Sequence, residues 1–159
     1  MNRRQLIARL AAGSAAAVFG QRAQAAQPAV NTLKNSFFSS RTDTAINGYD
    51  TVAYFTQGKP VKGLDSLVVE WMGAKWKFST PAHLDLFKAG PEKYAPQYGG
   101  YCAYGVAQGA LVKVEPEQFT VREGRLYLNF DAEVQRQWKK DPEGFIRAAD
   151  MKFDALLKQ

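Results

Sequence analysis

An alternation of aromatic and charged side chains around one glycine restricts the fold of this chain more than any other feature of its sequence. The alternation flanks Gly73-Ala74, with the aromatic residues Trp71, Trp76 and Phe78 and the charged residues Glu70, Lys75 and Lys77. A period of two is that of a β-strand whose side chains point to opposite faces. We therefore expect residues 67–72 and 75–78 to form an antiparallel hairpin with Trp76 and Phe78 on its buried face.

Two further segments have the composition of strands. Residues 119–121 and 126–130 are joined around Gly124, which predicts a second hairpin. The run Val52-Ala53-Tyr54-Phe55 is β-branched and aromatic, which favours a short strand.

Helix signals follow each hairpin. Thr80-Pro81 is a capping residue followed by a proline at the first helical position, so a helix is expected from there to about Lys88. A single turn over 91–94 and a short tight helix over 99–109 come next. Asp131 is expected to cap a helix through residue 140, and Asp141-Pro142 to start the last helix. The predicted class is α+β, with small antiparallel hairpins packed against short helices and a C-terminal helical segment. The sequence shows no internal repeat.

The first 25 residues have the pattern of an export signal. A basic start with no acidic residue precedes an apolar stretch of 11 residues, 10–20, which is too short to span a bilayer. Ala23-Gln24-Ala25 is typical of a cleavage site, so we expect the mature chain to begin near Ala26, without a stable membrane anchor. Arg3-Arg4 before Gln5-Leu6-Ile7 resembles the twin-arginine signature, which implies export by that machinery to the periplasm. The alternative is the general secretory route, since Asn2 is not the Ser or Thr most typical of that position.

Removing this segment changes the charge of the chain. Four of the 21 basic residues lie within residues 1–25, which leaves 17 basic residues against 15 acidic ones and a net charge of +2. A charge this small does not predict nucleic-acid binding.

The remaining residues are expected to form an extended arm, 26–45, and one domain, 46–159. The side chains of Phe37 and Phe38 are expected to hold the arm against the domain.

Several segments carry a resemblance to a known family. They are Gly48 to Phe55, Trp76 to Ser79, Leu86-Phe87, the long block Pro91 to Ala103, Leu126 to Phe130, and the region from Trp138 to Phe145. In these segments the chain resembles the exported branch of the YHS-domain family. YHS domains occur beside heavy-metal transport ATPases, so the resemblance implies a binding module with a soft metal such as copper as its ligand. Metal-type members carry cysteines where this chain has residues 52–55 and 78–80.

The only cysteine and the only histidine are the candidate metal ligands. Cys102 is predicted near a helix start, where amide groups favour a thiolate that binds soft metals. The alternative is that Cys102 is a small buried hydrophobic residue. His83 occupies the third position of the helix capped by Thr80 and could coordinate as a neutral ring. The alternative for His83 is a partly exposed side chain with no ligand. A second histidine or cysteine is absent, so a metal site would need further ligands.

Other residues suggest a site without metal. Tyr98, Tyr101 and Tyr104 at helical spacing, together with Asp50, are candidates for a ligand pocket, although aromatics at such spacing are often core residues. Oxygen ligands around Gly48 (Asp43, Asn47, Asp50) could hold calcium or form a plain turn. No nucleotide-binding or hydrolase motif is present. The prediction is thus a non-enzymatic binding module; the alternatives are a peptide, partner or small-molecule interaction domain and a cysteine-dependent enzyme.

Overall fold

The structure is a computed structural model that describes residues 26–34 and 41–159. In chain order its elements alternate short helices with two hairpins: η1 (Ala45–Gly48), α1 (Ala53–Thr56), β1 (Leu64–Trp71), β2 (Ala74–Phe78), α2 (Pro81–Ala89), α3 (Pro91–Tyr94), η2 (Gln97–Gly100), α4 (Ala103–Gln108), β3 (Glu115–Arg122), β4 (Arg125–Asn129), α5 (Ala132–Trp138) and α6 (Pro142–Leu156). The η elements are single 3-10 turns. This arrangement is the predicted α+β class.

Both hairpins form as the alternation predicts. β1 pairs with β2 up to Trp71 opposite Ala74, so that the turn is Met72-Gly73 with φ of 48° and 75°. Two successive left-handed residues make the tight hairpin turn that matches the twist of the strands. Trp76 and Phe78 are 2% and 0% exposed, which confirms the predicted buried face. β3 and β4 form the second antiparallel hairpin.

Side-chain caps start three helices at the predicted positions. Thr80 accepts a hydrogen bond from the backbone N–H of His83, and Asp131 and Asp141 accept from Val134 and Gly144. Each bond satisfies an amide that the helix itself leaves without a partner. The caps of α2, α5 and α6 are therefore confirmed.

Two local predictions are wrong. Residues 53–56 form the helix α1 rather than a strand, because the carboxylate of Asp50 accepts the N–H groups of Val52 and Ala53 and turns the chain into a helix. Residues 99–109 do not form one helix. The chain is extended at Tyr101 between η2 and α4, and Cys102 is the residue that caps α4 rather than part of its first turn.

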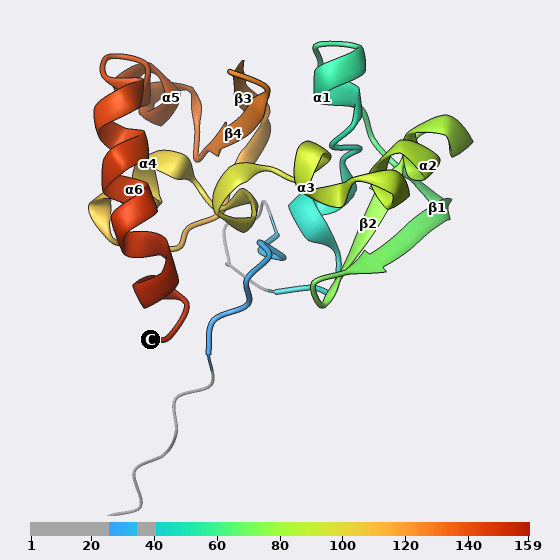
Figure 1. Cartoon of the computed structure of the whole chain (residues 1–159), viewed down its shortest axis with the longest axis horizontal. Helices are drawn as coiled ribbons and strands as arrows, with labels where there is room; N and C mark the ends of the chain where they lie inside the picture. The colour runs from blue at the N-terminus through green and yellow to red at the C-terminus, as the bar shows by residue number, and fades with distance from the viewer. Residues whose placement is uncertain (1–25, 35–40) are drawn as a thin grey trace, which may run out of the picture.

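The predicted arm is integrated into the domain where the structure describes it. Residues 30–33 are all buried, and Val30 belongs to the main hydrophobic cluster with Trp76 and Phe78. The backbone N–H of Asn31 donates to Gly99 O, and its carbonyl accepts from Ile46 N. The segment therefore contacts both η1 and η2, and Figure 1 shows it running into the middle of the molecule. Phe37 and Phe38 lie outside the described residues.

The structure contains an internal repeat that is not visible in the sequence. Each half consists of a left-handed turn, a capped short helix, a hairpin of eight-residue and five-residue strands, a capped helix, and a helix that starts at Pro-Glu. Equivalent elements are 51 residues apart: the strands start at 64 and 115 and at 74 and 125, and the helices at 81 and 132 and at 91 and 142. In Figure 1 the first half lies on the right and the second on the left.

Small irregularities of the backbone recur in both halves. Each hairpin has a register shift in its first strand, between Leu64 and Val68 and between Glu115 and Phe119. Each left-handed turn is closed by a backbone hydrogen bond, from Tyr49 N to Ile46 O and from Tyr101 N to Tyr98 O. The residue after each of these tyrosines donates its backbone N–H to a carbonyl about ten residues further along the chain: Asp50 N to Val61 O, and Cys102 N to Val112 O. Such bulges and turns are features of a fold rather than defects, so we regard the halves as two copies of one unit.

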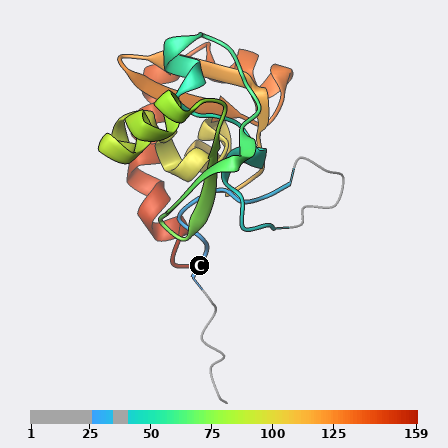
Figure 2. The same ribbon diagram turned by 90° about the vertical axis from the view of Figure 1, so that its right-hand side faces the viewer.

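The two halves are packed together rather than separate. The main hydrophobic cluster includes Trp76 and Phe78 of the first hairpin with Leu126 and Leu128 of the second. A second cluster lies under α6 and includes Trp138 and Ala149. Figure 2, turned by 90°, shows the first hairpin in front of α6 and the second hairpin above both.

Candidate functional site

The candidate site is built around the left-handed turn of the first half. Ile46 and Asn47 have φ of 49° and 53°, and Gly48 has φ of 75°. Asparagine and glycine adopt this conformation at low cost, but a β-branched residue does not. Ile46 is held there by burial, since it is only 1% exposed. The turn presents the carbonyl of Asn47 and the ring of Tyr49 to one side.

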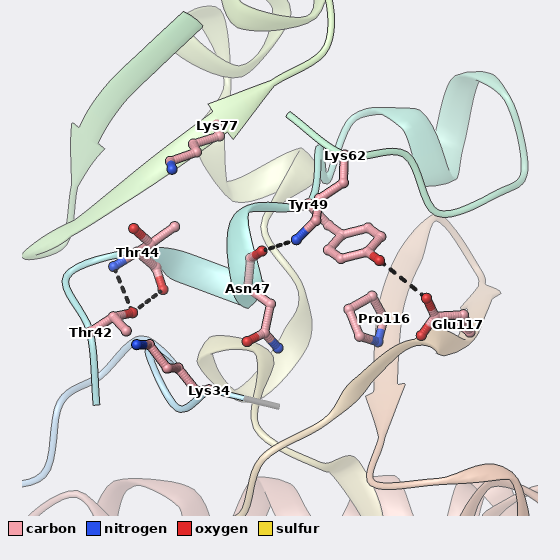
Figure 3. Close-up of a pocket in the computed structure, with 9 residues that line it drawn as sticks. All are labelled: Lys34, Thr42, Thr44, Asn47, Tyr49, Lys62, Lys77, Pro116 and Glu117. Atoms are coloured by element: carbon pink, nitrogen blue, oxygen red, sulfur yellow. Dashed lines mark hydrogen bonds between the residues drawn. The ribbon is translucent and has the colours of Figure 1, made fainter. Parts of the chain in front are cut away.

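A pocket of about 450 Å³ opens on that side. Its lining comes from the segment before the turn, the turn itself, the loop before β1, the strand β2 and the start of β3: Lys34, Thr42, Thr44, Asn47, Tyr49, Lys62, Lys77, Pro116 and Glu117. Figure 3 shows Lys34, Thr42, Thr44 and Lys77 toward one end and Tyr49, Pro116 and Glu117 toward the other. The volume lies within the range of about 300–1,000 Å³ that is usual for ligand sites.

The pocket lining is positively charged, with three lysines against one glutamate. Lys62 Nζ donates to Asn47 O at 2.8 Å and lies 4.5 Å from the centre of the Tyr49 ring. Lys77 Nζ lies 2.6 Å from Asp65 Oδ1, but Asp65 is 91% exposed. Exposed ion pairs of this kind contribute little, so a ligand carboxylate could replace Asp65.

At the end of the pocket near Pro116 and Glu117, the hydroxyl of Tyr49 is a hydrogen-bond donor. Its hydroxyl donates to Glu117 Oε1 at 3.2 Å. Partial burial raises the pKa of Tyr49 above its ordinary value, and the charge of Glu117 raises it further. The phenol therefore keeps its proton at neutral pH and can donate to a ligand oxygen.

Directly after Tyr49, the carboxylate of Asp50 is fully buried and accepts five hydrogen bonds. Its Oδ1 accepts the N–H groups of Val52 at 3.0 Å and Ala53 at 3.3 Å. Its Oδ2 accepts Ser79 N at 2.8 Å, Ser79 Oγ at 2.5 Å and His83 Nδ1 at 2.6 Å. These bonds join the pocket loop to α1, to the end of β2 and to α2, so Asp50 positions Tyr49 rather than contacting a ligand.

Both ring nitrogens of His83 have partners. Nδ1 bonds to Asp50, and Nε2 lies 3.1 Å from Thr56 Oγ1. The Thr56 hydroxyl is also 3.2 Å from Val52 O and can donate to it. His83 is 8% exposed and is thus a member of this buried network. A metal ion could reach a ring nitrogen only by displacing one of these partners.

The thiol of Cys102 is buried, in agreement with the alternative given for it above. It is 1% exposed, its sulfur accepts Gly105 N at 3.3 Å, and it faces Asn129 Oδ1 at 3.8 Å. Burial raises the pKa of the thiol above its ordinary value of 9.0. The protonated thiol is a poor nucleophile and a poor metal ligand.

The two predicted metal ligands have different neighbours. Cys102 bonds to residues of α4 and β4, whereas His83 bonds to Asp50 and Thr56. Within residues 26–34 and 41–159 no three or more His, Cys, Asp or Glu side chains are grouped to hold a metal ion. The oxygen ligands considered for calcium also diverge, because Asp43 pairs with Lys75 while Asp50 points into the interior.

The three tyrosines proposed for a pocket are packed in the interior or against it. Tyr98 and Tyr101 are 7% and 0% exposed, and their hydroxyls donate to Asp150 Oδ1 and Pro28 O. Tyr104 is half-buried, and its ring centre lies 5.0 Å from that of Phe145. These residues form the second hydrophobic cluster and its edge.

Sequence reasoning missed the lysines and Tyr49. They come from four separate segments and have no shared spacing, so only the folded chain brings them together. The available signal was Asn47-Gly48, which predicted the turn that carries Tyr49.

Comparison with protein-family models, curated proteins and solved structures finds no match to this chain. In the parts of the chain that the structure describes, no helix is both long enough and apolar enough to cross a membrane.

Proposed function

We propose that the protein is an exported, non-enzymatic binding module of YHS type, and that its lysine-lined pocket binds an anionic ligand. The observation that carries this proposal is the pocket itself, in which three ammonium groups and a phenol donor surround about 450 Å³. Carboxylate and phosphate groups are the ligands that such donors recognise. The buried Asp50 network holds the pocket loop in place, which reduces the entropic cost of binding.

The family resemblance supports a binding role, whereas the geometry disfavours the soft-metal ligand that the resemblance also implies. The resemblance covers the turn with Gly48 and Tyr49 and continues through Cys102. The geometry favours the pocket over Cys102, because the sulfur is buried and its raised pKa keeps it protonated. The same two facts weigh against a cysteine-dependent enzyme.

A titration of the full-length chain followed by amide NMR shifts tests the proposal. Citrate is expected to cause saturable shifts confined to the pocket residues, and Cu(I) to leave the spectrum of the region around Cys102 unchanged. Lys34→Glu should weaken citrate binding about three- to ten-fold, since it replaces an attraction with a repulsion. Lys88→Glu is the matched control, because Lys88 is exposed on α2 outside the pocket. Absence of any saturable shift with citrate would refute an anion site.

Export to the periplasm is part of the same proposal. It is supported by the basic start, the short apolar stretch and the Ala23-Gln24-Ala25 ending, all of which lie outside the described residues. Replacing Arg3 and Arg4 with lysine should block export if the twin-arginine machinery carries the protein. Export of the double variant at the normal level would contradict that route.

A further inference from the structure

The internal repeat allows the pocket to be compared with its counterpart in the second half. There the left-handed turn of η2 is covered by residues 28–31. Asn31 N donates to Gly99 O at 2.8 Å, and Tyr101 Oη donates to Pro28 O at 2.9 Å. The covering segment lies directly on the turn, since a Cβ atom placed on Gly99 would come 1.8 Å from Ala29 O.

The same two groups line the pocket in the first half. Asn47 O corresponds to Gly99 O, and Tyr49 Oη corresponds to Tyr101 Oη, in both cases 52 residues apart (47 and 99, 49 and 101). Here side chains satisfy them: Lys62 Nζ donates to Asn47 O, and Glu117 Oε1 accepts from Tyr49. Side chains can rotate away, whereas the backbone of residues 28–31 cannot.

We propose that the pocket binds a short extended segment of another polypeptide that carries acidic side chains. A backbone N–H of this segment donates to Asn47 O and a backbone carbonyl accepts from Tyr49 Oη, as Asn31 and Pro28 do on the second half. This proposal rests on the proposed function and specifies its ligand. The protein thus contains, in its own residues 28–31, an example of the bound peptide.

The charges of the pocket explain why the segment should be acidic. When a peptide N–H takes over Asn47 O, the ammonium group of Lys62 is released and can pair with a peptide carboxylate. Lys34 and Lys77 lie at the other end of the pocket, so carboxylates at both ends find a partner (Figure 3). Glu117 is an intramolecular competitor, because it places a carboxylate where the peptide carbonyl would accept from Tyr49.

The test uses the full-length chain and four probes: tetraglutamate with acetylated and amidated ends, the same peptide with methylated backbone nitrogens, tetraglutamine with the same blocked ends, and citrate. Amide NMR titration gives the affinity for each probe. Loss of one hydrogen bond corresponds to about a five-fold weaker affinity. The methylated peptide should therefore bind at least about five-fold more weakly than unmethylated tetraglutamate, and tetraglutamine should bind more weakly still.

Two variants examine the Tyr49 hydroxyl. Tyr49→Phe should reduce the affinity for unmethylated tetraglutamate about five-fold, because it removes the donor to the peptide carbonyl. Glu117→Gln should increase the peptide affinity, because it removes the competing carboxylate. Thermal unfolding of each variant confirms that it is folded.

The outcomes separate the two proposals. If citrate and both tetraglutamates bind alike and Tyr49→Phe has no effect, the pocket is an anion site and the extended-peptide inference is wrong. If neither citrate nor a peptide causes saturable shifts, the proposed function fails together with the inference.

Discussion

Replacing Asp50 with asparagine should destabilise the protein strongly, although the two side chains have nearly the same shape. The carboxylate is fully buried and accepts hydrogen bonds from four residues: Val52, Ala53, Ser79 and His83. An amide has only one acceptor oxygen. If this oxygen faces Ser79 and His83, the NH2 group must face the N–H groups of Val52 and Ala53.

The size of the effect follows from these bonds. Ala53 N keeps a partner in the main-chain carbonyl of Asp50 at 3.2 Å, but Val52 N loses the carboxylate oxygen that accepted it. A buried donor without a partner costs about 1–3 kcal/mol. The three bonds from Ser79 N, Ser79 Oγ and His83 Nδ1 also lose the negative charge of their acceptor, which weakens each by about 1 kcal/mol. The expected loss is about 4–6 kcal/mol, a large part of the roughly 5–15 kcal/mol that is typical of a domain.

Urea unfolding followed by tryptophan fluorescence measures this loss, since Trp76 and Trp138 are both buried. Asp85→Asn is the control, because Asp85 is exposed on α2 and its replacement should change the free energy of unfolding by less than about 0.5 kcal/mol. A loss below about 1 kcal/mol for Asp50→Asn would refute the reasoning that this carboxylate joins the pocket loop to β2 and α2.

Three further predictions concern other parts of the fold. Trp76→Ala should lower the free energy of unfolding by about 3–5 kcal/mol, because the 2% exposed ring packs 5.1 Å from that of Phe87; a loss below about 1 kcal/mol in urea would contradict this. The native Cys102 thiol should react slowly with a thiol reagent, with or without Cu(I), and labelling at the rate of the unfolded chain would show an accessible thiol. Because the pKa of this thiol is raised in the folded state, the free energy of unfolding should fall as the pH rises above 9.0. Tyr101→Phe should cost about 1 kcal/mol in thermal unfolding, since its hydroxyl holds Pro28, whereas Tyr49→Phe should cost less; equal losses would mean that the two hydroxyls do not differ in role.

Local rules predicted the parts of the fold that depend on neighbouring residues. The alternation around Gly73 predicted the first hairpin, and Thr80 and Asp131 predicted the starts of α2 and α5. These features are set by strand period and by caps within three residues. The predicted strand at residues 52–55 is wrong for a related reason, because the cap that Asp50 supplies overrides the β-propensity of these residues.

The repeat and the pocket could not be found in this way. Equivalent positions of the two halves keep Gly48 and Gly100, Gly73 and Gly124, and the Pro-Glu starts of α3 and α6, but most others differ in polarity. The tyrosine at the pocket and its buried counterpart differ only in what covers them. The pocket lining comes from residues 34 to 117, and nothing in a local pattern relates such distant positions.

The comparison of the halves also bears on why the Asp50 network exists. At the positions of Asp50, Ser79 and His83 the second half has Cys102, Phe130 and Val134 (50 and 102; 79 and 130; 83 and 134). The same scaffold therefore folds with a small thiol and two apolar side chains at these positions. A buried ion pair is often no more stabilising than well-packed apolar residues, while removal of one partner is costly. The fold alone thus does not require the charged network, and its presence in the half that carries the open pocket is consistent with a role in fixing the pocket loop. The apolar version is found where residues 28–31 already cover the turn.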